Sequence, residues 1–310
     1  VDIIIALNHV GLNKDVAIAE AVPGIDVVIG GHSHTLMTNG DAETPSYPMM
    51  VGDTPVAQAY AYTKYLGHLT VTFDDAGNVT AASGDPIVLD ASVMPNEAFL
   101  ARIAEMGAPI EEMKTRVVAD AADVIGGDRT VCRAMECSMG SLIADAMLDR
   151  VADQGVEIAI QNGGGIRASI DSGPITMGEV LTVLPFQNTL STFQVTGATM
   201  VAALENGVSQ IEDGAGRFPQ VAGMSYAFDA AQPAGSRISD VMVGGAPIDL
   251  DKLYGVVSNN YVRNGGDGYA MFVDAQNAYD FGPDLADVTA EFLAAQGPFT
   301  PYTDGRIVAK

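Results

Sequence analysis

Three of the four histidines in this chain lie near its start, at spacings that suit metal coordination. His32 and His34 stand two residues apart, directly after a glycine pair and the mostly apolar run 25–29. His9 follows a similar run at 1–7. Short apolar runs of this kind predict buried strands, and open α/β sheets gather ligands beyond the carboxyl ends of their strands. Neutral imidazole is a preferred ligand of zinc and similar ions, so the pattern predicts part of a metal centre. The alternative is two unrelated surface turns that carry histidine.

Three histidines do not complete the site of a two-metal hydrolase, which also requires bridging and terminal carboxylates. The chain begins inside the strand predicted at 1–7. We therefore expect that a preceding segment is missing.

Composition restricts the classes of partner. With 310 residues, of which 48% are hydrophobic, the chain is long enough for two domains with substantial cores. Its formal charge of −24 argues against nucleic-acid binding, which requires a basic surface. Nor does any apolar stretch reach the length of a membrane span. Composition therefore disfavours both nucleic-acid binding and a membrane span.

Several residues of the second half have the chemistry to bind a nucleotide. The glycine triplet 163–165 follows a predicted strand and allows the backbone to approach a ligand. Arginine suits bidentate capture of phosphate, aromatic rings can stack on a base, and an aspartate between glycines could accept hydrogen bonds from sugar hydroxyls. The candidates are Arg129, Arg133, Arg167, Phe186, Tyr261 and Asp267.

Each of these features also has a purely structural interpretation. Glycine-rich loops after strands are commonly plain turns, and single arginines are commonly solvated surface charges. Phe186 could belong to the core, and Asp267 could simply shape its turn. Tyr261 could be buried with a polar partner for its hydroxyl.

The two cysteines, Cys132 and Cys137, leave two alternatives open. They are too few for a structural zinc site and too far apart for a redox Cys-x-x-Cys motif. A short disulfide would indicate an oxidising compartment, whereas two free thiols would suit a cytosolic protein.

Periodicity predicts a mixed α/β chain. Helical spacing of apolar residues is present at 12–21, 95–116, 138–150, 177–184, 198–205 and 284–295. Further strands are predicted at 156–160 and 254–259, and an alternating, aromatic-rich run predicts strands within 58–73. The turn residues 74–78 predict a hairpin, and Pro109 is expected to interrupt the helix at 95–116.

Taken in order, the motifs of the chain resemble those of the 5'-nucleotidase family. This family includes ecto-5'-nucleotidases, periplasmic UDP-sugar hydrolases and 2',3'-cyclic nucleotide phosphodiesterases. The resemblance covers essentially the whole chain, and several markers in the right order are far more specific than any one of them. The markers are Asn-His-Val-Gly at 8–11, Gly-Gly-His-Ser-His-Thr at 30–35, the run 58–67, the run 132–140, Asn-Gly-Gly-Gly-Ile-Arg at 162–167, Leu-Pro-Phe at 184–186 and Asn-Gly-Gly-Asp-Gly-Tyr at 264–269.

The resemblance implies an α/β (α+β) architecture with three parts. Residues 1–93 correspond to the C-terminal part of a four-layer α/β-β-α metallophosphatase domain. Residues 94–116 correspond to a linker helix, and residues 117–310 to a separate α/β domain that binds the nucleotide.

Residue roles follow from the same resemblance. It implies that His9 and His32 bind one divalent metal ion and that His34 binds a second, with zinc or manganese as typical ions. Arg129, Arg133 and Arg167 match residues that hold the phosphate, and Asn162 matches one that contacts the base. Phe186 and Tyr261 match the two aromatic residues that clamp the base, Asp267 matches the one that binds the ribose hydroxyls, and Cys132 and Cys137 match a short disulfide.

The chain departs from the family pattern in two ways. Asn8 and Val10 replace the commoner glycine and serine beside the first histidine, positions that tune metal binding. The family's Asp-x-His, metal-bridging Asp and Asn-His elements are not found in the chain, so we expect it to hold no catalytic residue and to be inactive alone.

The function implied is removal of the 5'-phosphate from nucleotides by a periplasmic or extracellular enzyme that uses two divalent metal ions. The alternatives are a 2',3'-cyclic nucleotide phosphodiesterase or 3'-nucleotidase, a UDP-sugar hydrolase, and a non-catalytic module that binds nucleotides.

Overall fold

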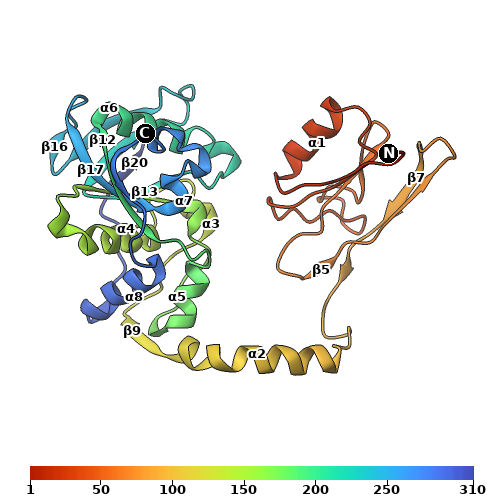
Figure 1. Ribbon diagram of the computed structural model, residues 1–310, viewed down its shortest axis with the longest axis horizontal. Coiled ribbons are helices and arrows are strands. Elements are labelled where there is room, and N and C mark those ends of the chain that lie inside the picture. Colours follow the sequence, from red (N-terminus) through yellow and green to blue (C-terminus); the bar gives the residue numbers. More distant parts are fainter. The chain divides into compact units, whose positions relative to one another are not determined.

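The chain divides into two compact units, which we call unit 1 and unit 2 (Figure 1). The computed structural model describes residues 1–108 and 110–310. Unit 1 covers Val1–Ile103 and unit 2 covers Ala104–Lys310, so the boundary falls within helix α2 (Glu97–Thr115). Helix α2 corresponds to the predicted linker helix, whereas the expected interruption at Pro109 lies outside the described residues. The three domain limits drawn from the sequence stay predictions.

Unit 1 contains a four-stranded sheet that orders the histidine-bearing loops. Strands β1 (Ile5–Leu7), β2 (Val27–Ile29) and β4 (Thr54–Ala57) run parallel, and β3 (Met49–Val51) pairs with β4 in the antiparallel sense. Helix α1 (Leu12–Ala21) connects β1 to β2, as a parallel crossover requires. The carboxyl ends of β1, β2 and β4 therefore lie at one edge of the sheet.

The rest of unit 1 confirms the predicted hairpin and corrects one predicted strand. Strands β6 (Leu69–Phe73) and β7 (Val79–Gly84) form the hairpin. Short strands β5 (Tyr65–Leu66) and β8 (Ile87–Val88) pair beside it. The alternating aromatic run at 58–63 is not a strand, because Tyr60, Tyr62 and Thr63 have φ values of 62°, 58° and 53°. These left-handed conformations are incompatible with an extended ladder.

Unit 2 is built around a mixed five-stranded sheet. Strands β10 (Ile158–Asn162) and β17 (Leu253–Asn259) are parallel neighbours at its centre. The other three strands pair in the antiparallel sense, namely β12 (Leu190–Thr196), β13 (Pro219–Ala222) and β18 (Gln276–Tyr279). Because β10 and β17 run in the same direction, their carboxyl ends lie side by side.

Side-chain alternation along the central strands divides unit 2 into two hydrophobic cores. Ile160 and Val256 belong to one core, which also contains apolar residues of α6 (Gly197–Val208). Ala159 and Val257 belong to the other core. This second core is covered by α4 (Ser138–Arg150), α5 (Met177–Val183) and α8 (Leu285–Ala295). A sheet buried on both faces gives a rigid base for the loops that follow its strands.

Smaller elements complete unit 2, and the mixed α/β class predicted from the sequence is confirmed (Figure 1). Strand β9 (Val117–Ala121) pairs with β11 (Gly173–Thr176) and β19 (Pro298–Phe299), and a second small sheet contains β14 (Met224–Phe228), β15 (Ile238–Val243), β16 (Ala246–Pro247) and β20 (Ile307–Ala309). In the part of the chain that the structure describes, no helix combines the length and apolar character needed to cross a bilayer.

Candidate functional site

The structure brings His9 and His32 together at the carboxyl edge of the unit 1 sheet. His9 follows β1 and His32 follows β2, and their ring centroids lie 5.2 Å apart in an edge-to-face arrangement. The ring of His34 lies 5.1 Å from the ring of Tyr62. His32 and His34 both have left-handed backbone angles, with φ values of 78° and 57°. Residues held in such rarely populated conformations are concentrated at functional sites.

Gln58, at the end of β4, holds the loop that carries His32 and His34. This side chain is 2% exposed, and its Oε1 accepts hydrogen bonds from the Thr35 amide at 2.6 Å and the Ser33 hydroxyl at 3.0 Å. Its Nε2 donates to the Gly31 carbonyl at 3.2 Å. Sequence reasoning did not single out Gln58, although its place after a third parallel strand was the available signal.

Gly30 and Gly31, before His32, leave space for neighbouring side chains that a Cβ atom would occupy. A Cβ at Gly30 would lie 2.1 Å from Oδ2 of Asp15, which is fully buried in α1. A Cβ at Gly31 would lie 3.0 Å from Nδ1 of His9. Oδ1 of Asp15 accepts a hydrogen bond from Asn8 at 3.0 Å. Asp15 was also missed, because an aspartate in the first turn of a helix usually faces water.

The histidines alone do not make a complete metal site. Among residues 1–108 and 110–310, no three His, Cys, Asp or Glu side chains are arranged to hold an ion. A catalytic zinc site requires three protein ligands, and His9 and His32 supply two adjacent imidazoles. The roles of His9, His32 and His34 as metal ligands therefore stay a prediction.

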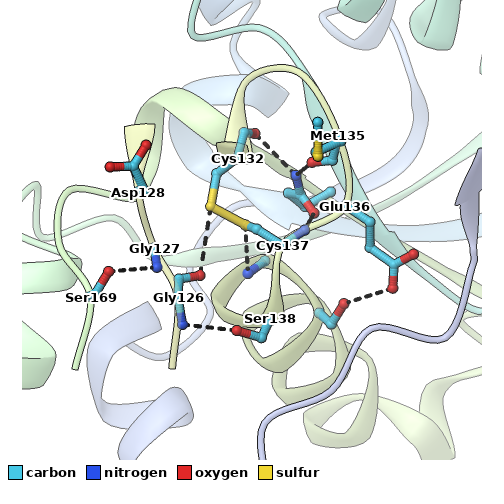
Figure 2. Close-up of a disulfide and its surroundings, with 12 residues drawn as sticks. Gly126, Gly127, Asp128, Cys132, Met135, Glu136, Cys137, Ser138 and Ser169 are labelled. Carbon is cyan, nitrogen blue, oxygen red and sulfur yellow. Dashed lines mark hydrogen bonds between the residues drawn. A yellow bond between two sulfur atoms is a disulfide. The ribbon is translucent and has the colours of Figure 1, made fainter. Parts of the chain in front are cut away.

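In unit 2, a disulfide closes a short loop that leads into α4, as the resemblance implied (Figure 2). Cys132 and Cys137 are bonded, with their Cα atoms 5.2 Å apart. The buried Gln220 of β13 spans the loop from inside. Its Nε2 donates to the carbonyls of Cys132 at 3.0 Å and Met135 at 2.7 Å, and its Oε1 accepts from the Cys137 amide at 3.2 Å. The loop is thus anchored to the central sheet, and the free-thiol alternative is wrong.

Two of the predicted phosphate-binding arginines lie against two glycine-containing loops, one that follows β10 and one that precedes β13. Arg133, which is 6% exposed, donates from Nη1 to the Gly214 carbonyl at 3.2 Å. Arg167 donates to the Gly164 carbonyl at 3.3 Å, and its guanidinium lies 5.6 Å from the centre of the Phe186 ring. The Gly164 amide in turn donates to the carbonyl of Gly216 at 2.7 Å, which connects the two loops.

Arg129, the third of these arginines, begins the short helix α3 (Arg129–Cys132) and is half-buried. Its role at the phosphate stays a prediction.

Asn162, Tyr261 and Asp267 meet at the carboxyl ends of β10 and β17, and we call these three residues the Asp267 cluster. Oδ1 of Asp267 accepts a hydrogen bond from the Tyr261 hydroxyl at 3.0 Å, and Oδ2 accepts from Nδ2 of Asn162 at 2.7 Å. The Asp267 amide donates to the Tyr261 hydroxyl at 3.2 Å. Asp267 lies between two glycines and has a φ of 53°, so its backbone is in the rarely populated left-handed conformation.

The two predicted base-clamping rings are both exposed. Phe186 is 54% exposed and Tyr261 is 46% exposed, so neither belongs to a core. Partial burial, together with the nearby Asp267 carboxylate, raises the pKa of the Tyr261 hydroxyl above its usual value. The hydroxyl therefore stays protonated and able to donate to Asp267. That the two rings face each other stays a prediction.

Asn206 and Arg217 form a second layer of hydrogen bonds that reaches the backbone of Asp267. The sequence analysis predicted neither residue. Nδ2 of Asn206 donates to the Asp267 carbonyl at 3.2 Å, and Arg217 donates to Oδ1 of Asn206 at 3.3 Å. A polar residue within the apolar helix α6 was the available signal for Asn206.

Comparison with known proteins identifies relatives of this chain. The family model described as 5'-nucleotidase, C-terminal domain, matches residues 117–274, which contain the Asp267 cluster, the disulfide loop and all three arginines. The chain belongs to the 5'-nucleotidase family. Its mixed α/β fold is that of the solved family members, as shown by the 5'-nucleotidase precursor of Thermus thermophilus. That structure has a TM-score of 0.83 and 39% identity, covering 100% of this chain and 64% of the other.

Curated relatives extend the match over almost the whole chain. A trifunctional nucleotide phosphoesterase of Bacillus subtilis is 39% identical over 98% of this chain and 21% of its own length. The 5'-nucleotidase of Rattus norvegicus is 35% identical over 98% of this chain and 58% of its own length. A snake venom 5'-nucleotidase of Macrovipera lebetinus is 33% identical over 98% of this chain and 82% of its own length. The chain thus spans less than two thirds of the first two relatives.

Proposed function

We propose that this chain is part of a metal-dependent 5'-nucleotidase and that unit 2 recognises the nucleotide. The observation that carries the proposal is the Asp267 cluster. Its carboxylate is half-buried, accepts hydrogen bonds from Asn162 and Tyr261, and is located at the ends of two parallel strands. Ligands of open α/β sheets gather at such strand ends. Membership of the family supports the same assignment.

In this proposal each part of the nucleotide meets a different chemistry. The base stacks on the exposed rings of Phe186 and Tyr261, because every base has a flat π-face. The ribose hydroxyls donate to the Asp267 carboxylate. The phosphate is held by guanidinium groups, which suit its geometry, and the three residues that supply them are Arg129, Arg133 and Arg167.

We also propose that His9, His32 and His34 contribute ligands for two divalent ions, which activate a water and stabilise the phosphoryl oxygens when bound.

We infer a periplasmic or extracellular location, because disulfides persist in oxidising compartments. A wider phosphoesterase activity is a second candidate, since the Bacillus subtilis relative is named trifunctional. Cyclic nucleotides and UDP-sugars are therefore substrates to test beside AMP.

Calorimetry with adenosine tests the Asp267 cluster without requiring metal or phosphate. The chain should bind adenosine, and Asp267→Ala should weaken it about tenfold, the loss expected for a hydrogen bond to a charged group. Asp240→Ala is the matched control, because Asp240 also has a left-handed backbone, with a φ of 52°, but lies in β15. A chain that binds neither adenosine nor AMP would contradict the proposed function.

The aromatic clamp is tested in the same assay. Phe186→Ala and Tyr261→Ala should each weaken adenosine binding by about 1–3 kcal/mol through loss of a stacking surface. Phe281→Ala is the control, because this ring is 84% exposed in the same unit. If both clamp variants bind adenosine as the parent chain does, the base lies elsewhere.

A further inference from the structure

Asn259, the last residue of β17, uses every polar atom of its side chain in the interior of unit 2. The residue is fully buried. Its Nδ2 donates to Oε1 of Gln161 at 2.9 Å and to Oδ1 of Asn162 at 3.0 Å. Its Oδ1 accepts from the Val262 amide at 2.9 Å. Since both ends of the amide are used, only one orientation of this side chain satisfies all three partners.

The first consequence is that Asn259 sets the orientation of the Asn162 amide. Asn162 is 3% exposed, and its Oδ1 faces the N–H groups of Asn259. Its Nδ2 must therefore point away, toward Oδ2 of Asp267 at 2.7 Å. A flipped Asn162 would place two donors against each other and a carbonyl against a carboxylate. The Asn162 side chain thus serves the carboxylate of Asp267.

The second consequence concerns Tyr261. Asn259 is the N-cap of the short helix α7 (Asn260–Arg263), and its Oδ1 receives the Val262 amide. N-capping by asparagine fixes the direction in which such a helix begins. Tyr261 is the second residue of α7, and its hydroxyl donates to Oδ1 of Asp267. One buried side chain therefore places both residues that hold the carboxylate.

The number of further hydrogen bonds that the Asp267 carboxylate can accept determines which ligand the Asp267 cluster can recognise. An ionised carboxylate has about four lone-pair positions, two on each oxygen. The protein donates one side-chain hydrogen bond to each oxygen, from Tyr261 and from Asn162. Each oxygen keeps the capacity to accept one more. Two acceptors on one fixed carboxylate match two neighbouring hydroxyls, as on the 2' and 3' carbons of ribose.

We propose that Asn259 is a positioning residue that determines the preference of this site for nucleosides with a 2',3'-diol. This inference rests on the proposed function, because it assumes that a nucleoside occupies the Asp267 cluster. Asn259 does not touch the ligand in this assignment. It acts by fixing the donors that orient the carboxylate.

The test is a selectivity ratio, the Kd of 2',3'-dideoxyadenosine divided by the Kd of adenosine, measured by calorimetry on the 310-residue chain. Asn259→Ser keeps a side-chain oxygen that can cap α7 but removes the two N–H donors. We expect the ratio to fall about tenfold, since a disordered carboxylate loses a hydrogen bond of the charged class. The Kd of dideoxyadenosine should stay within about twofold, because stacking on Tyr261 is retained.

Ser258→Ala is the matched control for loss of a buried hydrogen bond. Ser258 is the neighbouring residue of β17, is fully buried, and donates to the Ile160 carbonyl at 2.8 Å. This variant should lower thermal stability and leave the selectivity ratio unchanged. If Asn259→Ser lowers stability in the same way with an unchanged ratio, Asn259 is merely structural and the inference is wrong.

A double-mutant cycle with Asp267→Ala shows whether Asn259 acts through the carboxylate. In that background, Asn259→Ser should change adenosine affinity no further, whereas additive losses would overturn the inference. Asn259→Asp, which keeps the cap and replaces the donors by an acceptor, provides a second variant if the serine does not fold. If Asp267→Ala abolishes the diol preference and both Asn259 variants keep it, only this inference fails. If the parent chain binds no nucleoside, the proposed function fails with it.

Discussion

The histidine edge of unit 1 and the Asp267 cluster of unit 2 are built at equivalent places but supported differently. Each lies beyond the carboxyl ends of parallel strands, β1 and β2 in one case and β10 and β17 in the other. In unit 1, the buried Gln58 side chain bonds to the backbone of Gly31 and Thr35 and to the Ser33 hydroxyl. The buried Asp15 carboxylate accepts a hydrogen bond from Asn8. In unit 2, the buried side-chain amide of Asn162 donates directly to the carboxylate of the candidate residue Asp267.

This difference indicates how complete each site is within the described residues. The buried core beside the histidine edge consists of Met37, Tyr47 and Ala57, with partly buried neighbours, whereas the unit 2 sheet is covered on both faces. Functional groups need a rigid first layer and a supporting layer to hold their geometry. In the proposed site of unit 2, Asn162 and Tyr261 contact the Asp267 carboxylate, and Asn259 in turn contacts Asn162. In unit 1, His9 and His32 are adjacent, but no group of three His, Cys, Asp or Glu side chains among the described residues could hold an ion.

The largest expected effect is on phosphatase activity and concerns the histidine edge of unit 1. The 310-residue chain, supplied with zinc or manganese, should release no phosphate from AMP above the uncatalysed background, because two imidazoles do not hold a catalytic ion. Phosphate release is measured with a longer family member as the positive control. Turnover comparable with that control would show that unit 1 is complete, and the contrast between the two edges would then be wrong.

The next effect concerns phosphate recognition by unit 2. Arg133→Ala and Arg167→Ala should each weaken AMP binding about 10- to 100-fold, the range expected for charge-assisted hydrogen bonds, and should leave adenosine binding nearly unchanged. Calorimetry with both ligands separates the two outcomes. Arg150→Ala is the control, because its guanidinium pairs with Glu291 on the exposed side of α4 and α8. Equal losses for AMP and adenosine would indicate a structural role for the two arginines.

A smaller effect is expected on the stability of unit 2, which contains the disulfide, and none on that of unit 1. Reducing the Cys132–Cys137 disulfide should lower the free energy of unfolding of unit 2 by about 2 kcal/mol, because the loop it closes is short. Unit 1 should unfold as before. Hydrogen exchange with and without reductant measures each unit separately, and a matching loss in unit 1 would show that the stabilities of the two units are coupled.

The smallest expected effect is the contribution of Tyr302, in unit 2, to the pH dependence of stability. Burial, with a contribution from Asp145, raises the pKa of Tyr302 to about 12 from the ordinary value of 10.0. Below pH 10 the hydroxyl is protonated in both the folded and unfolded states, so its contribution to stability is fully present. Between about pH 10 and 12 the unfolded state releases the proton first, and stability falls.

Tyr302→Phe should therefore make the loss of stability between pH 10 and 12 less steep, as measured by denaturant unfolding across that range. Tyr279→Phe, at another exposed tyrosine of unit 2, controls for removal of a hydroxyl. An unchanged slope for Tyr302→Phe would show that the proton of Tyr302 is not linked to folding.

Local patterns predicted most helices of this chain with little error. The spacing at 138–150 and 284–295 corresponds to α4 and α8, because an apolar face at helical period reports burial directly. The alternating run at 58–63 was misleading, since alternation describes a strand only if the backbone is extended. Tyr60 and Tyr62 instead adopt left-handed conformations in a loop.

The motifs of the sequence indicated the family, and the resemblance to that family implied the Cys132–Cys137 disulfide and the candidacy of Asp267 and Tyr261 as site residues. These are properties of short motifs, whose members lie close together in the chain. Only the tertiary structure decided which groups orient the carboxylate. Asn259 and Asn162 are 97 residues apart, and Asn162 and Asp267 are 105 apart. An amide within an apolar strand carries no sign of its partner, because the hydrogen bond exists only once the sheet has placed the two strand ends side by side.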